Sequence, residues 1–104
     1  MNMTTYLAYF VCSPVEGTSN YHLHATACYF VWILHTNQAD AEKRARQVVE
    51  HEGWKIDTFK GIHVFTRESA AGHPDNLRSF EAVQRCGIVS ECITSPAGDA
   101  PRFN

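Results

Sequence analysis

The sequence predicts an α+β domain with an antiparallel sheet, and three observations support this. Segments rich in aromatic and β-branched residues alternate with amphipathic helix patterns, turn residues separate them, and 104 residues is the usual size of one domain. The expected order is β-β-α-β-(β)-α-β. From the second strand onward this matches the ferredoxin-like plait, with an added N-terminal strand and two helices on one face of the sheet.

The chain is expected to form a single domain over residues 1–95, with a flexible tail over 96–104. That tail holds two prolines, a glycine and an aspartate, a composition typical of irregular chain ends. The first two strands are expected at 5–12 and 24–35, joined by a loop around 14–20 that is rich in Pro, Gly, Ser and Asn. Two strands joined in this way most simply form an antiparallel hairpin.

A first helix is expected between Asn37 and Gly53. Asn37 is a good N-cap residue with Asp40 three positions later, and Gly53 suits the position just after a helix. The spacing i, i+4, i+7, i+8 predicts one apolar face, formed by Ala41, Ala45, Val48 and Val49.

The second half of the chain is expected to return to the sheet twice. A strand is predicted at 54–59, a turn or bulge at Lys60–Gly61, and extended chain at 62–66. A polar loop over 67–74 then leads to a helix at 77–86, capped by Asp75 or Asn76 and ended by Gly87. The last strand is expected at 88–94.

The first two strands are apolar on both faces, which is unusual for an antiparallel sheet with helices on one side. If Cys12 pairs with Ala25, each face collects large apolar side chains, and something must cover the face without helices. A second copy of the chain is one source, which favours a homodimer resembling a dimeric α+β barrel. The alternative is a different register, or cover from the extra strand or the tail. On this register one face carries Tyr6, Ala8, Phe10, Ala25, Ala27, Tyr29, Val31 and Ile33, and the other carries Leu7, Tyr9, Val11, Cys28, Phe30, Trp32 and Leu34.

The alanines on the first face allow helices to approach closely, so the second face is expected to point toward a partner or ligand. The candidate binding residues, in a pocket on the sheet face or at a subunit interface, are therefore Tyr9, His24, Phe30 and Trp32.

The six histidines do not form an evident catalytic or metal-binding motif. His22 and His24 point the same way in an extended segment and offer two zinc ligands, but a third ligand would have to come from Glu16, His63 or His73. Ordinary polar contacts explain the pair as well, and no metal is predicted. His35 is a general-base candidate at the sheet rim, or simply a half-exposed residue at a strand end.

The four cysteines form no C-x-x-C pair, and no export signal opens the chain. They are expected to be reduced, mostly buried thiols in a cytoplasmic protein, without a nucleophilic role. No phosphate-binding glycine loop and no serine-centred motif is present, so no cofactor is expected.

The formal net charge of −2 argues against nucleic-acid binding, and no apolar run is long enough to span a membrane. Three functions remain: a homo-oligomeric binding or interaction protein, a cofactor-independent enzyme acting on an apolar small molecule through His24, Tyr9 and Trp32, or a metal-binding module. A pocket of roughly 300 Å3 or more near the hairpin, with a histidine inside it, would separate the enzyme from the interaction protein, whereas a filled core would favour plain association.

Overall fold

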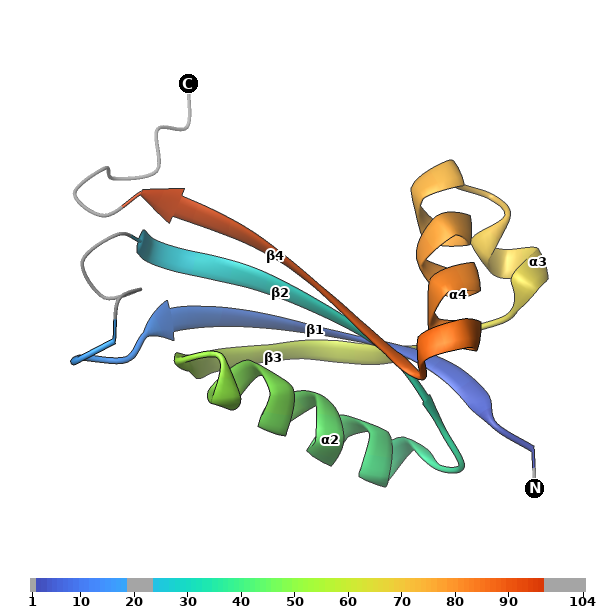
Figure 1. The fold of residues 1–104 in the computed structure, drawn as a ribbon, viewed down its shortest axis with the longest axis horizontal. Helices are drawn as coiled ribbons and strands as arrows, with labels where there is room; N and C mark the ends of the chain where they lie inside the picture. Colours follow the sequence, from blue (N-terminus) through green and yellow to red (C-terminus); the bar gives the residue numbers. More distant parts are fainter. Residues whose placement is uncertain (1, 19–23, 97–104) are drawn as a thin grey trace.

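Four strands form one antiparallel sheet in the order β3-β1-β2-β4 (Figure 1). The computed structural model describes residues 2–18 and 24–96. The central strands are β1 (Thr4–Pro14) and β2 (His24–His35), and the edge strands are β3 (Trp54–Phe65) and β4 (Ile88–Pro96). The chain is therefore an α+β fold, as expected, and the added first strand lies inside the sheet rather than at its edge.

The first helix, α2 (Gln38–His51), forms for the reasons that the sequence indicates. The Asn37 side chain caps it by accepting a hydrogen bond from the backbone N–H of Asp40 at 2.8 Å. The small or branched residues on its inner face (Ala41, Ala45 and Val49) are buried, while Arg46 and Glu42 form a half-buried ion pair at 3.0 Å.

The chain between β3 and β4 contains two helices, where the sequence predicts a polar loop and one helix. The one-turn helix α3 (Arg67–Ala70) is held by reciprocal hydrogen bonds between Thr66 and Ser69. The longer helix α4 (Pro74–Cys86) begins three residues earlier than expected. His73, rather than Asp75 or Asn76, is its N-cap residue.

The register of the central hairpin places Cys12 opposite Ala27, two residues from the expected partner Ala25. A shift of two residues keeps each side chain on the same face, because side chains alternate with a period of two. Face A, as we call it, carries Tyr6, Ala8, Phe10, Cys12, Ala27, Tyr29, Val31 and Ile33, and face B carries Leu7, Tyr9, Val11, Cys28, Phe30, Trp32 and Leu34.

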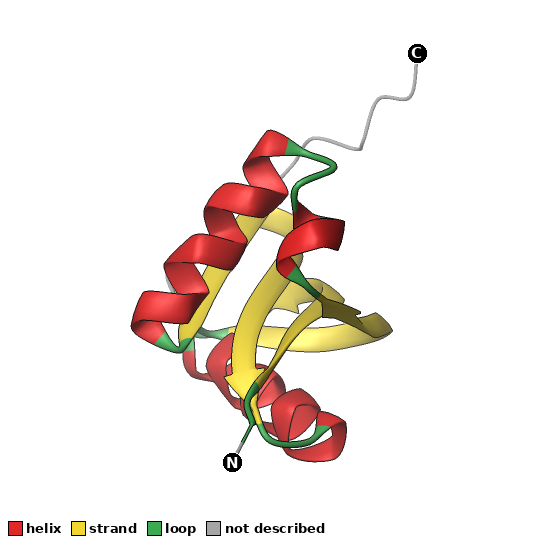
Figure 2. Cartoon of the chain, turned by 90° about the vertical axis from the view of Figure 1, so that its right-hand side faces the viewer, coloured by secondary structure: helices red, strands yellow, loops and turns green. Residues whose placement is uncertain are grey.

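The helices pack on opposite faces of the sheet, which corrects the expectation of two helices on one face. Ala45 and Val49 of α2 pack against face A, together with Phe10 and Val31. On the other side, α3 and α4 pack against Trp32 of face B. Figure 2 shows the sheet lying between α2 and the α3–α4 pair. The polypeptide thus covers part of face B itself, and the cover comes from α3 and α4 rather than from the extra strand or the tail that the sequence left as an alternative.

The segment Trp54–Phe65 forms one strand with an irregularity at Lys60, so the optional extra strand of the plait does not exist separately. The pairing of β1 with β3 jumps between Tyr9 and Phe10, and Gly61 adopts a φ of +140° that favours glycine. With one long strand here and helices on both faces, the ferredoxin-like arrangement is not confirmed.

Three sequence-based expectations lie partly outside the described residues: the loop around 14–20, of which 19 and 20 are not described, the tail, of which 97–104 are not described, and His22 of the pair His22 and His24. The last described strand continues to Pro96, just beyond the expected domain limit. No helix within the described ranges is long and apolar enough to cross a membrane.

Candidate binding groove

A groove of about 280 Å3 lies on face B, where the first turn of α4 meets β2 and β4. Three parts of the chain form this groove. The strands supply an apolar floor, β4 adds a carboxylate, and the start of α4 adds polar groups. Its lining consists of Leu7, Phe30, Trp32, His73, Asp75, Asn76, Glu91 and Ile93.

The floor of the groove is fixed by aromatic packing. Trp32 is only 2% exposed and contacts the ring of Phe65, with ring centroids 4.8 Å apart. Phe30, two residues earlier on the same face, is half-buried and stacks on Tyr9 at 4.6 Å with an angle of 16° between the rings. These contacts hold the floor rings in place without a ligand.

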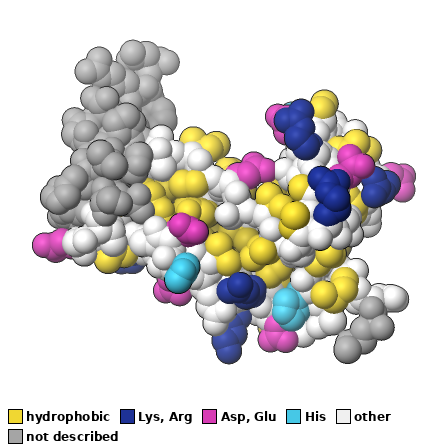
Figure 3. All heavy atoms as spheres, in the orientation of Figure 1, with side chains coloured by type: hydrophobic (Ala, Val, Ile, Leu, Met, Phe, Trp, Pro, Cys, Tyr) yellow, Lys and Arg dark blue, Asp and Glu magenta, His cyan; other side chains and the backbone are white. Residues whose placement is uncertain are grey.

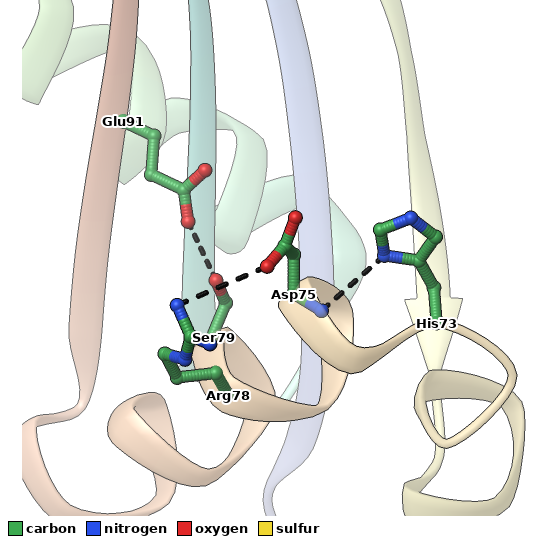
Figure 4. A network of polar contacts seen from close by, with 5 residues as sticks. All are labelled: His73, Asp75, Arg78, Ser79 and Glu91. Atoms are coloured by element: carbon green, nitrogen blue, oxygen red, sulfur yellow. Dashed lines mark hydrogen bonds and ion pairs between the residues drawn. The ribbon is translucent and has the colours of Figure 1, made fainter.

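The polar wall comes from the first turn of α4, which Figure 4 shows standing over the strands. Pro74 suits the first helical position because its missing N–H is not needed there. The Nδ1 atom of His73 accepts a hydrogen bond from the backbone N–H of Asp75 at 3.3 Å. The neutral ring therefore carries its proton on Nε2, which makes that atom a hydrogen-bond donor.

The carboxylates of Asp75 and Glu91 give the groove its charge. Glu91 accepts a hydrogen bond from the Ser79 hydroxyl, and this bond ties β4 to α4. Asp75 lies 3.8 Å from Arg78, but both side chains are largely exposed, so this pair is weak (Figure 4). Because the lining contains two carboxylates and no lysine or arginine, the groove attracts cations.

Face B continues beyond the groove, away from α4. This open end of face B consists of Tyr9, Val11, Cys28 and, from β4, Ile93. The first three are half-buried, whereas Ile93 is 65% exposed. In Figure 3 hydrophobic side chains form a band across the middle of the molecule. Exposed apolar surface of this kind is typical of binding surfaces.

Tyr9 is held as a neutral phenol at the border of the groove. Its hydroxyl donates a hydrogen bond to Cys28 Sγ at 3.6 Å. This hydrogen bond, partial burial and the neighbouring thiol all raise the pKa of Tyr9. A phenol with a raised pKa is a poor general base at neutral pH, so Tyr9 offers a surface for stacking rather than a catalytic group.

The four predicted binding residues do not come together in one place. Phe30 and Trp32 line the groove and Tyr9 borders it. Trp32 lies under α3 and α4, which corrects its expected outward position. His24 begins β2, six residues before Phe30 and therefore about 20 Å away along the strand, and its side chain is outside the described part.

The groove residues from α4 and β4 were missed by sequence reasoning. The sequence places His73 in a polar loop over 67–74, yet the Pro74 after it is the signal of a helix start. Glu91 lies opposite Phe30 in the sheet, and only the pairing of β2 with β4 brings the two together.

Outside the groove, His35 makes a local contact at the sheet rim, and the four thiols differ in exposure. His35 accepts a hydrogen bond at Nδ1 from the backbone N–H of Thr36 at 3.0 Å, outside the groove. Cys86 and Cys92 are exposed, which corrects the expectation that most thiols are buried. Among the described residues no group of three or more His, Cys, Asp or Glu side chains is placed to hold a metal ion.

Comparison with family models, with curated proteins and with solved structures finds no match for this chain. Its function must therefore be argued from the groove itself.

Proposed function

We propose that this chain is a binding protein for a small amphipathic molecule that has an apolar body and a positively charged end. The observation that carries the proposal is the groove on face B, in which two carboxylates stand above an apolar, aromatic floor. Its volume is close to that expected for a small-molecule site, and His73 lies on its wall.

The chemistry of the lining supports a specific orientation of the ligand. The apolar body would lie on Phe30 and Ile93, where it removes apolar surface from water. An ammonium group would lie between Asp75 and Glu91, where charge-assisted hydrogen bonds are strongest. His73 Nε2 would donate a hydrogen bond to an oxygen of the ligand.

Binding is better supported than catalysis. A histidine that acts as a general base needs a free lone pair, and the Nδ1 lone pair of His73 is used to cap α4. Tyr9, the other titratable ring nearby, is held in its neutral form. The groove therefore offers the enzyme hypothesis no evident general base, and among the described residues no three side chains are placed to hold a metal ion.

The test is an NMR titration of the 15N-labelled chain with three ligands of matched size: phenethylamine, phenethyl alcohol and phenylacetate. We expect the amine to bind most tightly, with a Kd on the order of 1 mM for so small a probe. The shifts should be confined to the backbone around Phe30, Trp32, Asp75 and Glu91.

Glu91→Gln should remove most of the preference for the amine, because it deletes one charge while keeping an acceptor for Ser79. The matched control is Glu50→Gln, an exposed position on α2 at the other side of the sheet, which should change nothing. Equal binding of the amine and the carboxylate, or shifts located elsewhere, would refute the proposal.

A further inference from the structure

The two edges of the sheet differ in how well they are protected against pairing with another strand. The ladder between β3 and β1 is interrupted twice, between Tyr9 and Phe10 and between Val11 and Cys12. The edge strand β3 also carries the exposed Lys55 and Lys60. Bulges and edge lysines are the usual means by which proteins prevent strands from adding to a sheet.

The opposite edge strand, β4, carries no lysine, and its ladder with β2 shifts register only at its C-terminal end, opposite His24 and Thr26. Its pairing with β2 is regular from Ala27–Thr94 to Ile33–Ile88. The segment Ser90–Thr94 is exposed and contains no lysine, arginine or proline. Its one charged side chain, Glu91, is hydrogen-bonded to Ser79. In the sheet order β4 has no strand on its outer side among the described residues (Figure 1). The backbone groups on that side therefore lack strand partners.

We infer that β4 is the docking edge for a second copy of this chain. Two β4 strands pair antiparallel around a twofold axis perpendicular to the sheet, and the two four-stranded sheets join into one sheet of eight strands. This dimer contact differs from the face-to-face arrangement that the sequence favours, because α3 and α4 already cover part of face B.

A second copy fits this edge for two reasons. A strand paired antiparallel with its own copy is self-complementary, so one patch serves both subunits. In this dimer both β4 strands are paired, and the two edge strands of the joined sheet are the β3 strands, which carry bulges and lysines. Because these edges resist further pairing, the assembly stops at two chains.

The side chains of β4 suit this pairing and limit its register. Ile93 is 65% exposed and gains cross-strand contacts with side chains of the partner's β4. A register that places Glu91 opposite its own copy is disfavoured by like-charge repulsion. Registers centred near Cys92 instead place Glu91 opposite Ile93 of the partner subunit.

The first test is the mass of the full chain in solution, measured by sedimentation equilibrium over a range of concentrations. We expect a dimer, twice the chain mass of 11.7 kDa. Ile93→Glu adds a carboxylate beside Glu91 at the seam and should raise the dimer dissociation constant on the order of 100-fold. Val64→Glu is the matched control, since Val64 is 56% exposed on the other edge strand and should leave the dimer intact.

A second measurement distinguishes edge pairing from any other dimer. Hydrogen–deuterium exchange should show that amides of β4 become more protected as the protein concentration rises, because edge pairing uses their outward N–H groups. A monomer at all concentrations, or a dimer that Ile93→Glu leaves unchanged and in which β4 gains no protection, would overturn the inference. The NMR titration tests ligand binding separately, through the preference for the amine, so that failure of the dimer and failure of the binding function are distinguishable.

Discussion

The indole ring of Trp32 lies between face B and the α3–α4 pair, in contact with Ala70, Phe80 and Val83. A large side chain in such a position contributes to stability through both its own burial and the cavity that its removal leaves. Phe30, two residues away, is half-buried and lies where α4 no longer covers the sheet. Two neighbouring side chains on the same face of β2 therefore contribute differently to the free energy of unfolding.

We predict that Trp32→Ala lowers the free energy of unfolding by about 3–5 kcal/mol, whereas Phe30→Ala lowers it by less than half as much. Urea titrations followed by circular dichroism give both values. The dimer mass of the folded Trp32→Ala protein should be unchanged, because the side chain packs on the face of the sheet under α3 and α4 and not at the outer edge of β4. A loss below about 1 kcal/mol would contradict the packing described for Trp32.

The buried thiol of Cys12 is expected to make the folded chain less stable at alkaline pH. Burial, with a contribution from the charge of Asp57, raises the pKa of its thiol from about 9 to about 12. The unfolded chain therefore loses this proton at lower pH than the folded chain does. The stability associated with Cys12 is fully present below pH 9 and is lost as the pH rises toward 12.

We predict that the free energy of unfolding falls between pH 9 and 11, with this thiol contributing at most about 1.4 kcal/mol per pH unit. Burial likewise raises the pKa of Tyr29 to about 12, which adds a similar decline above pH 10. Cys12→Ala should make the decline shallower when stability is measured against pH. Cys86→Ala, which removes an exposed thiol, should not.

At the scale of single elements, α4 ends through a glycine whose backbone is left-handed. Gly87 has a φ of +84°, and its N–H donates to Val83 O at 2.8 Å. A Cβ atom added there would meet no neighbour within 4 Å. Any cost of substitution therefore comes from the backbone conformation alone.

We predict that Gly87→Ala lowers the free energy of unfolding by about 1–2 kcal/mol, the cost of a left-handed residue that is not glycine. Gly72→Ala is the control, because that glycine has an ordinary φ and a Cβ would be 3.6 Å from the nearest atom. Thermal unfolding of the two variants side by side checks this. Equal melting temperatures would show that the α4–β4 junction rearranges to avoid the strain.

Elements with local signals could be predicted, and their arrangement could not. Asn37 and the spacing of Ala41 and Ala45 fix α2 within residues close in sequence. The start of α4 was misplaced because a histidine cap is unusual, although Pro74 marks it. Which face a helix covers depends on how the chain crosses the sheet, and loop composition carries no information about that choice.

At the scale of the whole molecule, the same limit applies to the groove. Phe30 and Trp32 could be named from the sequence because large aromatic residues on both faces of a hairpin are unusual. Glu91 and Asp75 come from segments that only the completed sheet brings together. These carboxylates, which determine the class of ligand, could therefore not be predicted from the local sequence pattern.

The placement of the two helix layers also sets an order of folding. The contacts of α2 with β1, β2 and β3 on face A are made entirely by residues 4–65, so a chain leaving the ribosome completes them first. Trp32 stays uncovered until residues 67–86 have followed. Trp54 packs beside Tyr29 on face A and Trp32 packs under α4, so each tryptophan reports on a different stage. The nascent chain therefore exposes Trp32 and the face around it until residues 67–86 have been added.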